Sequence, residues 1–305
     1  MAATARTALV LQGGGALGAY ELGAARRLYR DGDFAPDLIA GVSIGAITAV
    51  LLGRPRQGLL PLEALEAFWS EVTVSGWFLP PPLRRTLAGL VNREALADPE
   101  ATPALLVTAT DVAAGQIEVF YSRDGRFSLE HVLASGSLPP SFPMTRIEGV
   151  AYWDGGLFDN TPLGAVLDKM DGASALTAYV VNLFPNVAPI PRTMAQVIER
   201  VQNLQFANKT AEDLKLLHRF DEIAALIEAL GGHSVADDPA VAAALAVVRA
   251  RGYVRVPKIV PITRPQQLRG FDGSDFSPEA IKARADEGYA RADEALASAS
   301  MPQSP

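Results

Sequence analysis

Short hydrophobic runs recur along the first 190 residues, and segments whose apolar residues have helical spacing lie between them. The run 175–183 contains β-branched residues and no charge, which is typical of a strand in the middle of a sheet. Such runs predict strands at 7–12, 37–41, 104–110, 116–121, 150–153 and 175–183, and a late strand at 258–263.

The intervening segments predict helices, the clearest of which follows the second strand. Residues 44–52 are almost wholly apolar, so we expect this helix to be buried against a sheet. Strands that alternate with helices predict an α/β fold with the sheet sandwiched between helices. Helices are predicted at 17–30, 44–52, 62–74 and 128–136, and from Ser277-Pro278-Glu279 onward, where proline suits a first turn.

The pattern changes at about residue 191, where long helical stripes replace the short runs. We expect these stripes to face the core, and the last helix to bury one side. The sequence therefore predicts one domain over residues 7–190 and an extension over 191–305, mainly helical with one late strand, packed on the core. The stripes are Met194, Val197, Val201 and Leu204; Leu214, Leu217, Phe220, Ile223, Ile227 and Leu230; and Ile281, Ala285, Tyr289, Ala292 and Leu296.

Composition limits the classes of partner. The chain has 305 residues, 49% of them hydrophobic, which is enough for a substantial core. Its formal net charge of −7 without a Lys/Arg run argues against nucleic acid as a partner, and it does not favour electrostatic docking to anionic lipid. The absence of cysteine excludes disulfides and thiolate metal sites. We expect neither a metal nor a cofactor.

The position of the first predicted strand and the length of the apolar stretches bear on localisation. The first predicted strand begins close to Met1, so we expect no signal peptide. The longest apolar stretches are shorter than the roughly 18 residues that a membrane-spanning helix needs. The expected location is cytoplasmic.

Two glycine-rich segments follow the first two predicted strands. The second reads Gly41-Val42-Ser43-Ile44-Gly45, a G-x-S-x-G pattern. In this pattern a serine sits on a sharp strand-to-helix turn, and glycines two positions away on either side relieve clashes. Ser43 is therefore a candidate nucleophile. The alternative is a buried turn whose serine only caps the following helix.

The first glycine segment, Gly13-Gly14-Gly15-Ala16-Leu17-Gly18, allows two interpretations. Its spacing also fits G-x-G-x-x-G, the dinucleotide fingerprint, which expects an acidic residue at the end of the next strand. Asp33 and Asp37 precede the apolar run 38–40 instead of ending it. The stronger interpretation is an oxyanion hole made by backbone N–H groups of Gly14 and Gly15.

A nucleophilic serine needs a base, and an aspartate is the best candidate. His131, His218 and His233 lie in no recognisable catalytic setting, although a triad partner can come from anywhere in a sequence. Asp154, in Trp153-Asp154-Gly155-Gly156, follows a strand-like stretch and lies at a strand end, where active sites of open α/β sheets lie. The alternative is a plain Asx turn.

Together these motifs resemble the patatin-like phospholipase family over roughly residues 7–185. The resemblance also includes the segment 134–143 and Asn160-Thr161-Pro162-Leu163. It implies a three-layer α/β/α sheet sandwich, with residues 7–190 as the catalytic domain. The implied site consists of Ser43 as nucleophile, Asp154 as general base, the N–H groups of Gly13, Gly14, Gly15 and Ile44 as oxyanion hole, and the motif glycines Gly18, Gly41, Gly45, Gly155 and Gly156.

The resemblance implies a serine esterase, specifically a lipid acyl hydrolase of the phospholipase A or lysophospholipase type that forms an acyl-enzyme. One departure is Leu17, where many members carry Lys or Arg. The absence of that cation is expected to lower activity or to change the preferred head group. An acyltransferase or thioesterase is an alternative, but it usually calls for a histidine base and an arginine near the serine. A catalytically silent binding module is another.

The expected partner is a lipid or fatty-acyl ester substrate. The segment 77–83, which contains Trp77, Phe78 and three prolines, has two interpretations. Its aromatic residues either plug into the core or are exposed, where they contact a lipid surface transiently or cover the site.

Overall fold

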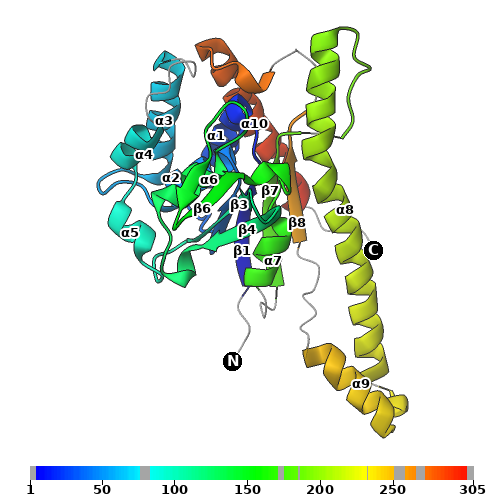
Figure 1. Ribbon diagram of the computed structural model, residues 1–305. Helices are drawn as coiled ribbons and strands as arrows, with labels where there is room; N and C mark the ends of the chain where they lie inside the picture. Colours follow the sequence, from blue (N-terminus) through cyan, green and yellow to red (C-terminus); the bar gives the residue numbers. More distant parts are fainter. Residues whose placement is uncertain are drawn as a thin grey trace.

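The structure is a computed structural model, and it describes residues 5–75, 83–170, 175–184, 186–231, 233–250, 258–265 and 272–300. Its centre is one 8-stranded sheet with the order β5-β6-β3-β2-β1-β7-β8, in which β4 pairs with β3 (Figure 1). The strands are β1 (Ala5–Leu11), β2 (Leu38–Gly41), β3 (Ala104–Asp111), β4 (Gln116–Tyr121), β5 (Thr145–Ile147), β6 (Val150–Asp154), β7 (Ala175–Asn182) and β8 (Lys258–Thr263). The strands predicted from hydrophobic runs are confirmed to within a few residues, whereas β5 was not predicted.

The centre of the sheet is parallel. Strand β1 lies between β2 and β7, with Leu11 opposite Gly41 on one side and Val181 on the other. The carboxyl ends of β1, β2 and β7 therefore meet at one edge, where open α/β sheets bind their ligands. Strand β6 runs antiparallel to β3 and ends at Asp154, opposite Ala109.

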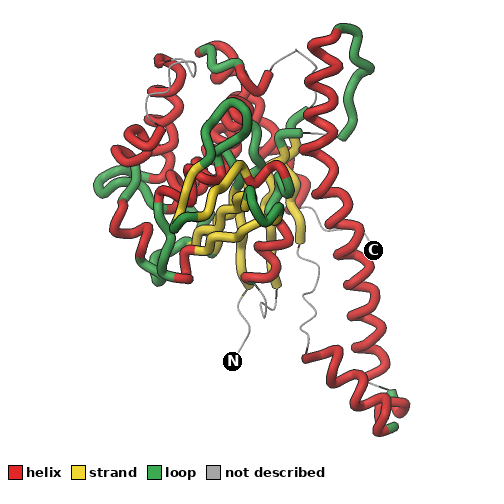
Figure 2. Tube along the Cα trace, in the orientation of Figure 1, coloured by secondary structure: helices red, strands yellow, loops and turns green. Residues whose placement is uncertain are grey.

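Helices cover both faces of the sheet (Figures 1 and 2). One hydrophobic cluster joins α1, α2, α3 and α10 to one face, and a second joins α7 to the other. The chain is thus a three-layer α/β/α sandwich. The helices are α1 (Ala19–Tyr29), α2 (Ile44–Gly53), α3 (Pro61–Ser75), α4 (Leu83–Leu90), α5 (Arg93–Ala97), α6 (Leu129–Ser135), α7 (Leu163–Lys169), α8 (Met194–Gly231), α9 (Pro239–Ala250) and α10 (Pro278–Ser300).

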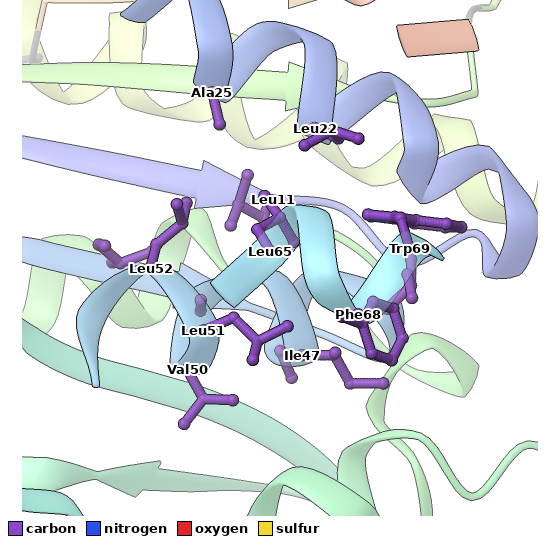
Figure 3. Packing of buried hydrophobic residues seen from close by; sticks show 14 of the residues in the cluster. Leu11, Leu22, Ala25, Ile47, Val50, Leu51, Leu52, Leu65, Phe68 and Trp69 are labelled. Atoms are coloured by element: carbon purple, nitrogen blue, oxygen red, sulfur yellow. The ribbon is translucent and has the colours of Figure 1, made fainter. Parts of the chain in front are cut away.

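Helix α2 is the centre of the larger cluster, as its apolar sequence predicted. All ten of its residues are buried. Figure 3 shows Ile47 and Leu51 of α2 close to Leu65 and Phe68 of α3, with Leu22 of α1 nearby. This packing fixes α2, and so it also fixes the turn from which α2 starts.

The last part of the chain completes the sandwich. Strand β8 pairs in parallel with β7, and α10 packs along α1. The two helices approach through glycines: a Cβ atom on Gly23 would lie 1.8 Å from the Ala285 carbonyl oxygen, and one on Gly288 would lie 2.0 Å from that of Tyr20. The predicted buried side of the last helix is confirmed by Ile281, Ala285 and Ala292. The division at residue 190 stays a prediction.

Helix α8 overturns one sequence prediction. The stripe Met194, Val197, Val201 and Leu204 was expected to face the core, but all four side chains are exposed. The helix runs along the side of the molecule and continues past the sheet to α9 (Figure 1). Hydrophobic periodicity indicates that a helix has an apolar face, but not what covers that face.

Two other expectations fall wholly or partly outside the described residues. Of the segment 77–83, only Leu83 is described, as the first residue of α4. In the second α8 stripe, the side chains of Leu214, Leu217, Phe220 and Ile223 are not described. Across the described ranges, no helix is both long and apolar enough to cross a membrane.

The α1–α10 crossing gives a first prediction. Gly23→Ala places a methyl group against backbone atoms of α10, so we expect it to lower the free energy of unfolding by about 2–4 kcal/mol. The matched control is Gly164→Ala in α7, where a Cβ atom would have no neighbour within 4 Å. This control is expected to be neutral or to stabilise by up to about 1 kcal/mol. Urea unfolding of both variants measures the difference, and equal effects would contradict the close approach.

A buried carboxyl group lies between α1 and α2. Glu21 is fully buried, and its Oε2 atom accepts a hydrogen bond of 2.6 Å from Thr48 Oγ1. Burial raises the pKa of Glu21 to about 8, and the hydrogen bond from Thr48 opposes this rise. The protonated form is therefore favoured in the folded chain.

This shift predicts how stability depends on pH. Because the folded pKa lies above the unfolded value, the stabilising effect of the bound proton is fully present below about pH 4.5 and is lost as pH rises to about 8. Glu21→Gln keeps an acceptor for Thr48 but cannot ionise. At about pH 8 and above, we expect the unfolding free energy of this variant to exceed that of the wild type by about 2–4 kcal/mol. Below about pH 4.5 the two values should differ little. Parallel stability profiles of the two proteins would show that Glu21 is not buried as described.

Candidate active site

Ser43 stands on a strained turn between β2 and α2. Its backbone φ is 56°, one of two positive φ values recorded for described residues other than glycine. A positive φ is costly for a residue with a side chain, and such a backbone conformation persists only where the surrounding structure imposes it. Here the imposed geometry is the sharp strand-to-helix turn that the G-x-S-x-G pattern predicted.

The two flanking glycines explain how so tight a turn fits. A Cβ atom on Gly41 would lie 2.2 Å from the Gly45 carbonyl oxygen, and one on Gly45 would lie 2.5 Å from the Leu11 carbonyl oxygen. Both positions face backbone atoms, which cannot move aside as a flexible side chain can. Glycine at these sites lets α2 start directly against β1 and β2.

The glycine segment after β1 lies beside this turn. A Cβ atom on Gly13 would lie 3.0 Å from Ser43 Cβ, so the backbone of Gly13 faces the serine. Gly15 has a φ of 57° and begins a short 3₁₀ helix (Gly15–Gly18) that leads into α1. Gly18 packs on Ile44, where a Cβ atom would meet the isoleucine side chain at 2.4 Å. The two glycine motifs are thus in direct contact.

Backbone donors remain available around the serine. Among the described residues, the N–H groups of Gly14, Gly15 and Ile44 donate no recorded hydrogen bond. The N–H group of Ser43 itself is used, because it donates to Ser135 Oγ at 2.9 Å. Unused N–H groups beside a helix N-terminus suit an anion.

Asp154 reaches the serine from the other side. It is the last residue of β6, and the register of β6 with β3 and of β3 with β2 brings it to the level where β2 has ended. Its backbone N–H donates to Ser137, and its carbonyl oxygen accepts from Thr110 Oγ1 at 2.8 Å. A Cβ atom on Gly155 would lie 2.5 Å from the Thr108 carbonyl oxygen, so glycine is required for this close turn.

The carboxyl group of Asp154 is almost completely buried. Its Oδ1 atom accepts the N–H of Gly156 at 2.8 Å, whereas Oδ2 is buried with no hydrogen-bond partner among the described residues. Burial raises the pKa of Asp154 to about 6, and the neighbouring Ser43 hydroxyl and the Gly156 N–H oppose this rise. The effect of the Ser43 hydroxyl on this pKa places it beside the carboxyl group. Sequence motifs more than a hundred residues apart meet here.

Asn160 and Gln12 hold the two halves of the site together, and sequence reasoning assigned neither a role. Asn160 is buried and donates from Nδ2 to the Gly13 carbonyl oxygen at 3.1 Å, while its Oδ1 lies against Gly156. Gln12 Nε2 donates to Thr161 Oγ1 and to the Phe206 carbonyl oxygen. The one signal in the sequence was a polar amide placed directly between the apolar run 7–11 and the glycine segment.

Gln12 also reaches the end of β7. Its Oε1 atom accepts the N–H groups of Leu183 at 2.6 Å and Phe184 at 3.1 Å. One buried side chain thereby connects β7, α8 and the segment after Asp154. It fixes the strand end from which the glycine segment starts.

The serine-rich segment before Asp154 supports the turn from behind. Ser135 and Ser137 are both buried. Ser135 Oγ accepts the Ser43 N–H, and the Ser137 carbonyl oxygen accepts the Asp154 N–H. The two serines thus brace the two candidate catalytic residues from one short stretch of chain.

The departure at Leu17 has a structural counterpart. Leu17 is buried in the main hydrophobic cluster. A cation comes to the same 3₁₀ helix from elsewhere, because Arg284 of α10 donates to the carbonyl oxygens of Ala16 at 3.3 Å and Asp275 at 2.6 Å. No sequence signal pointed to Arg284.

None of the hydrogen bonds described for Ser43 involves a histidine. His131 is buried in α6, where its Nδ1 atom accepts the Ser128 N–H as part of a helix cap, and burial lowers its pKa. His233 is exposed in the connection to α9, and the side chain of His218 is not described. Within the described ranges, no group of three or more potential metal-ligating His, Asp or Glu side chains gathers.

Of three comparisons with known proteins, one identifies the family of this chain. The sequence profile of the patatin-like phospholipase family matches residues 9–167, about half of the chain, and includes every candidate site residue. A search of curated proteins finds no match. Among solved structures, the chain is similar to VipD from Legionella pneumophila, with 16% identity, a TM-score of 0.45, and coverage of 96% of this chain and 67% of that one. From the family match, this chain belongs to the patatin-like phospholipase family.

Proposed function

We propose that the protein is a serine esterase that hydrolyses lipid acyl esters, of the phospholipase A or lysophospholipase type, with Ser43 and Asp154 as a catalytic dyad. The observation that carries this proposal is the strained Ser43 turn, whose hydroxyl faces the buried Asp154 carboxyl group. Family membership supports a lipid acyl ester as the substrate class. Strain of this kind is retained where function requires it.

In the first step, Asp154 accepts the proton of the Ser43 hydroxyl while Oγ attacks the ester carbonyl carbon. The carbonyl oxygen becomes an oxyanion, which the N–H groups of Gly14, Gly15 and Ile44 stabilise. As the intermediate collapses, the ester bond breaks and the leaving alcohol takes the proton from Asp154. The acyl group remains on Ser43.

In the second step, water attacks the acyl-enzyme. Asp154 accepts a proton from this water, and the same N–H groups stabilise the second oxyanion. Collapse releases the fatty acid and returns the proton to Ser43 Oγ. Asp154 therefore relays the proton in both steps, from Ser43 to the leaving alcohol and then from water back to Ser43.

The buried position of Asp154 makes this base effective. A carboxylate in water has a pKa of about 4 and is a weak base towards a hydroxyl group. Burial raises the pKa of Asp154 to about 6, so the group is a stronger base and is still ionised at neutral pH. The unpartnered Oδ2 atom is the acceptor that the Ser43 proton needs.

Substitution of either dyad residue tests the proposal. Ser43→Ala and Asp154→Asn are each expected to lower the hydrolysis of a dissolved short-chain ester by about a thousandfold or more. Asparagine keeps an oxygen for the Gly156 N–H, so the turn after β6 should stay intact. A fluorophosphonate probe is expected to label the wild type and not Ser43→Ala. A folded variant with near wild-type turnover would refute the dyad.

The pKa of Asp154 predicts the pH profile. The base must be ionised, so kcat/KM is expected to rise with pH through about 6 and to level off above it. Initial rates on the same ester, measured with a check that the protein stays folded, give this profile. A rate that keeps rising well above neutrality would indicate that the Asp154 carboxyl group does not control the reaction.

A further inference from the structure

We propose that the first three turns of α8 form a lipid-surface docking face that brings the active site to aggregated substrate. This inference rests on the proposed function, because it assigns the place where the lipid aggregate meets the protein. The docking face consists of Met194, Val197, Ile198, Val201 and Leu204, which lie at helical spacing on one side of α8. It runs for about 15 Å along the helix.

The orientation of α8 is the reverse of that expected for a surface helix. The docking face is solvent-exposed, with Met194 73% exposed, while the polar side chains of Glu199 and Asn203 are buried on the opposite side. A surface helix of a soluble protein normally buries its apolar side and exposes its polar side. An exposed apolar stripe of this length indicates a partner that covers it.

The segment that leads into α8 extends the same surface. Val187 and Ile190, which come just before the helix, are both more than 80% exposed. Two further apolar side chains, Leu157 and Phe158, are exposed directly after the Asp154 turn. Exposed apolar residues therefore occur at the site as well as on the helix beside it.

The docking face is tied to the site by its buried side. The Phe206 carbonyl oxygen of α8 accepts a hydrogen bond from Gln12 Nε2, and the Phe206 ring packs on Phe184 with centroids 5.2 Å apart. Gln12 immediately precedes the glycine segment. The docking face ends at Leu204, within one turn of Phe206, which anchors α8 beside the glycine segment, so its occupant lies near the site.

Charge selects a lipid surface as the occupant. The charged residues between positions 186 and 205 are Arg192, Glu199 and Arg200, and of these only Glu199 is buried. The accessible charges beside the apolar stripe are therefore both positive, although the whole chain carries −7. Apolar side chains flanked by arginine fit the interface of an anionic lipid membrane. The charge beside the stripe thus has the opposite sign to the net charge, from which docking to anionic lipid was not expected.

The test compares two double variants that remove similar apolar side chains. Val197→Gln with Val201→Gln changes the docking face, where the side chains are 41% and 50% exposed. The control, Val235→Gln with Val247→Gln, changes side chains that are 47% and 57% exposed but lie at the far end of α8 and in α9. Binding is measured by flotation with vesicles made of equal parts phosphatidylcholine and phosphatidylglycerol.

The docking-face variant is expected to bind these vesicles about tenfold more weakly or worse, whereas the control binds like the wild type. Both variants should hydrolyse a dissolved short-chain ester at the wild-type rate. Vesicles of phosphatidylcholine alone should bind the wild type several-fold less, because their surface carries no net negative charge to attract Arg192 and Arg200.

Three results would overturn the inference. They are a wild type that does not bind vesicles, equal weakening in both double variants, and a wild-type dimer that the docking-face variant converts to monomers in sedimentation velocity. The last would assign the face to a second copy of the chain. Flotation needs no turnover, so a protein that binds vesicles through this face but hydrolyses no ester would refute the proposed function alone.

Discussion

The close approach of β2 and α2 at Ser43 is the constraint on which the rest of the structure depends. The turn is short enough to force a positive φ on a serine, and it exists only because Gly41 and Gly45 bring no side chain to the contact. Helix α2 is held there by burial on all sides, which supplies the free energy that the strain costs. A rigid core thus keeps the Ser43 backbone in a conformation that an unconstrained chain would leave.

The second constraint is a buried carboxyl group that lacks a full set of partners. Asp154 gives one oxygen to the Gly156 N–H and leaves the other unpaired. Such burial costs stability, and a structural role would have favoured either a complete set of hydrogen bonds or a neutral side chain. The same burial raises the pKa of Asp154 to about 6, which suits the role of general base proposed for it. Glu21 shows a comparable cost inside the α1–α2 packing, where its Oε1 atom also has no hydrogen-bond partner among the described residues.

The second half of the chain contributes in two opposite ways. Strand β8 and α10 extend the sheet and its helical layer, and Arg284 of α10 reaches the 3₁₀ helix that follows the glycine segment. Helix α8 instead turns polar side chains inward and apolar ones outward. Both elements contact the glycine segment or its flanks. Arg284 of α10 donates to the Ala16 carbonyl oxygen, and the Phe206 carbonyl oxygen of α8 accepts from Gln12. Residues beyond the family match therefore set the surroundings of the site.

The sequence by itself determined the main strands, the helices between the first of them and the three candidate motifs, because hydrophobic period and glycine spacing are local properties. Only the tertiary structure decided that Ser43 and Asp154 meet, since strand register is set by contacts between distant segments. It also decided the roles of Gln12 and Asn160, whose amides are ordinary polar residues until the fold buries them. The outward face of α8 could not be predicted, because an apolar stripe has the same period whether it meets a core or another surface.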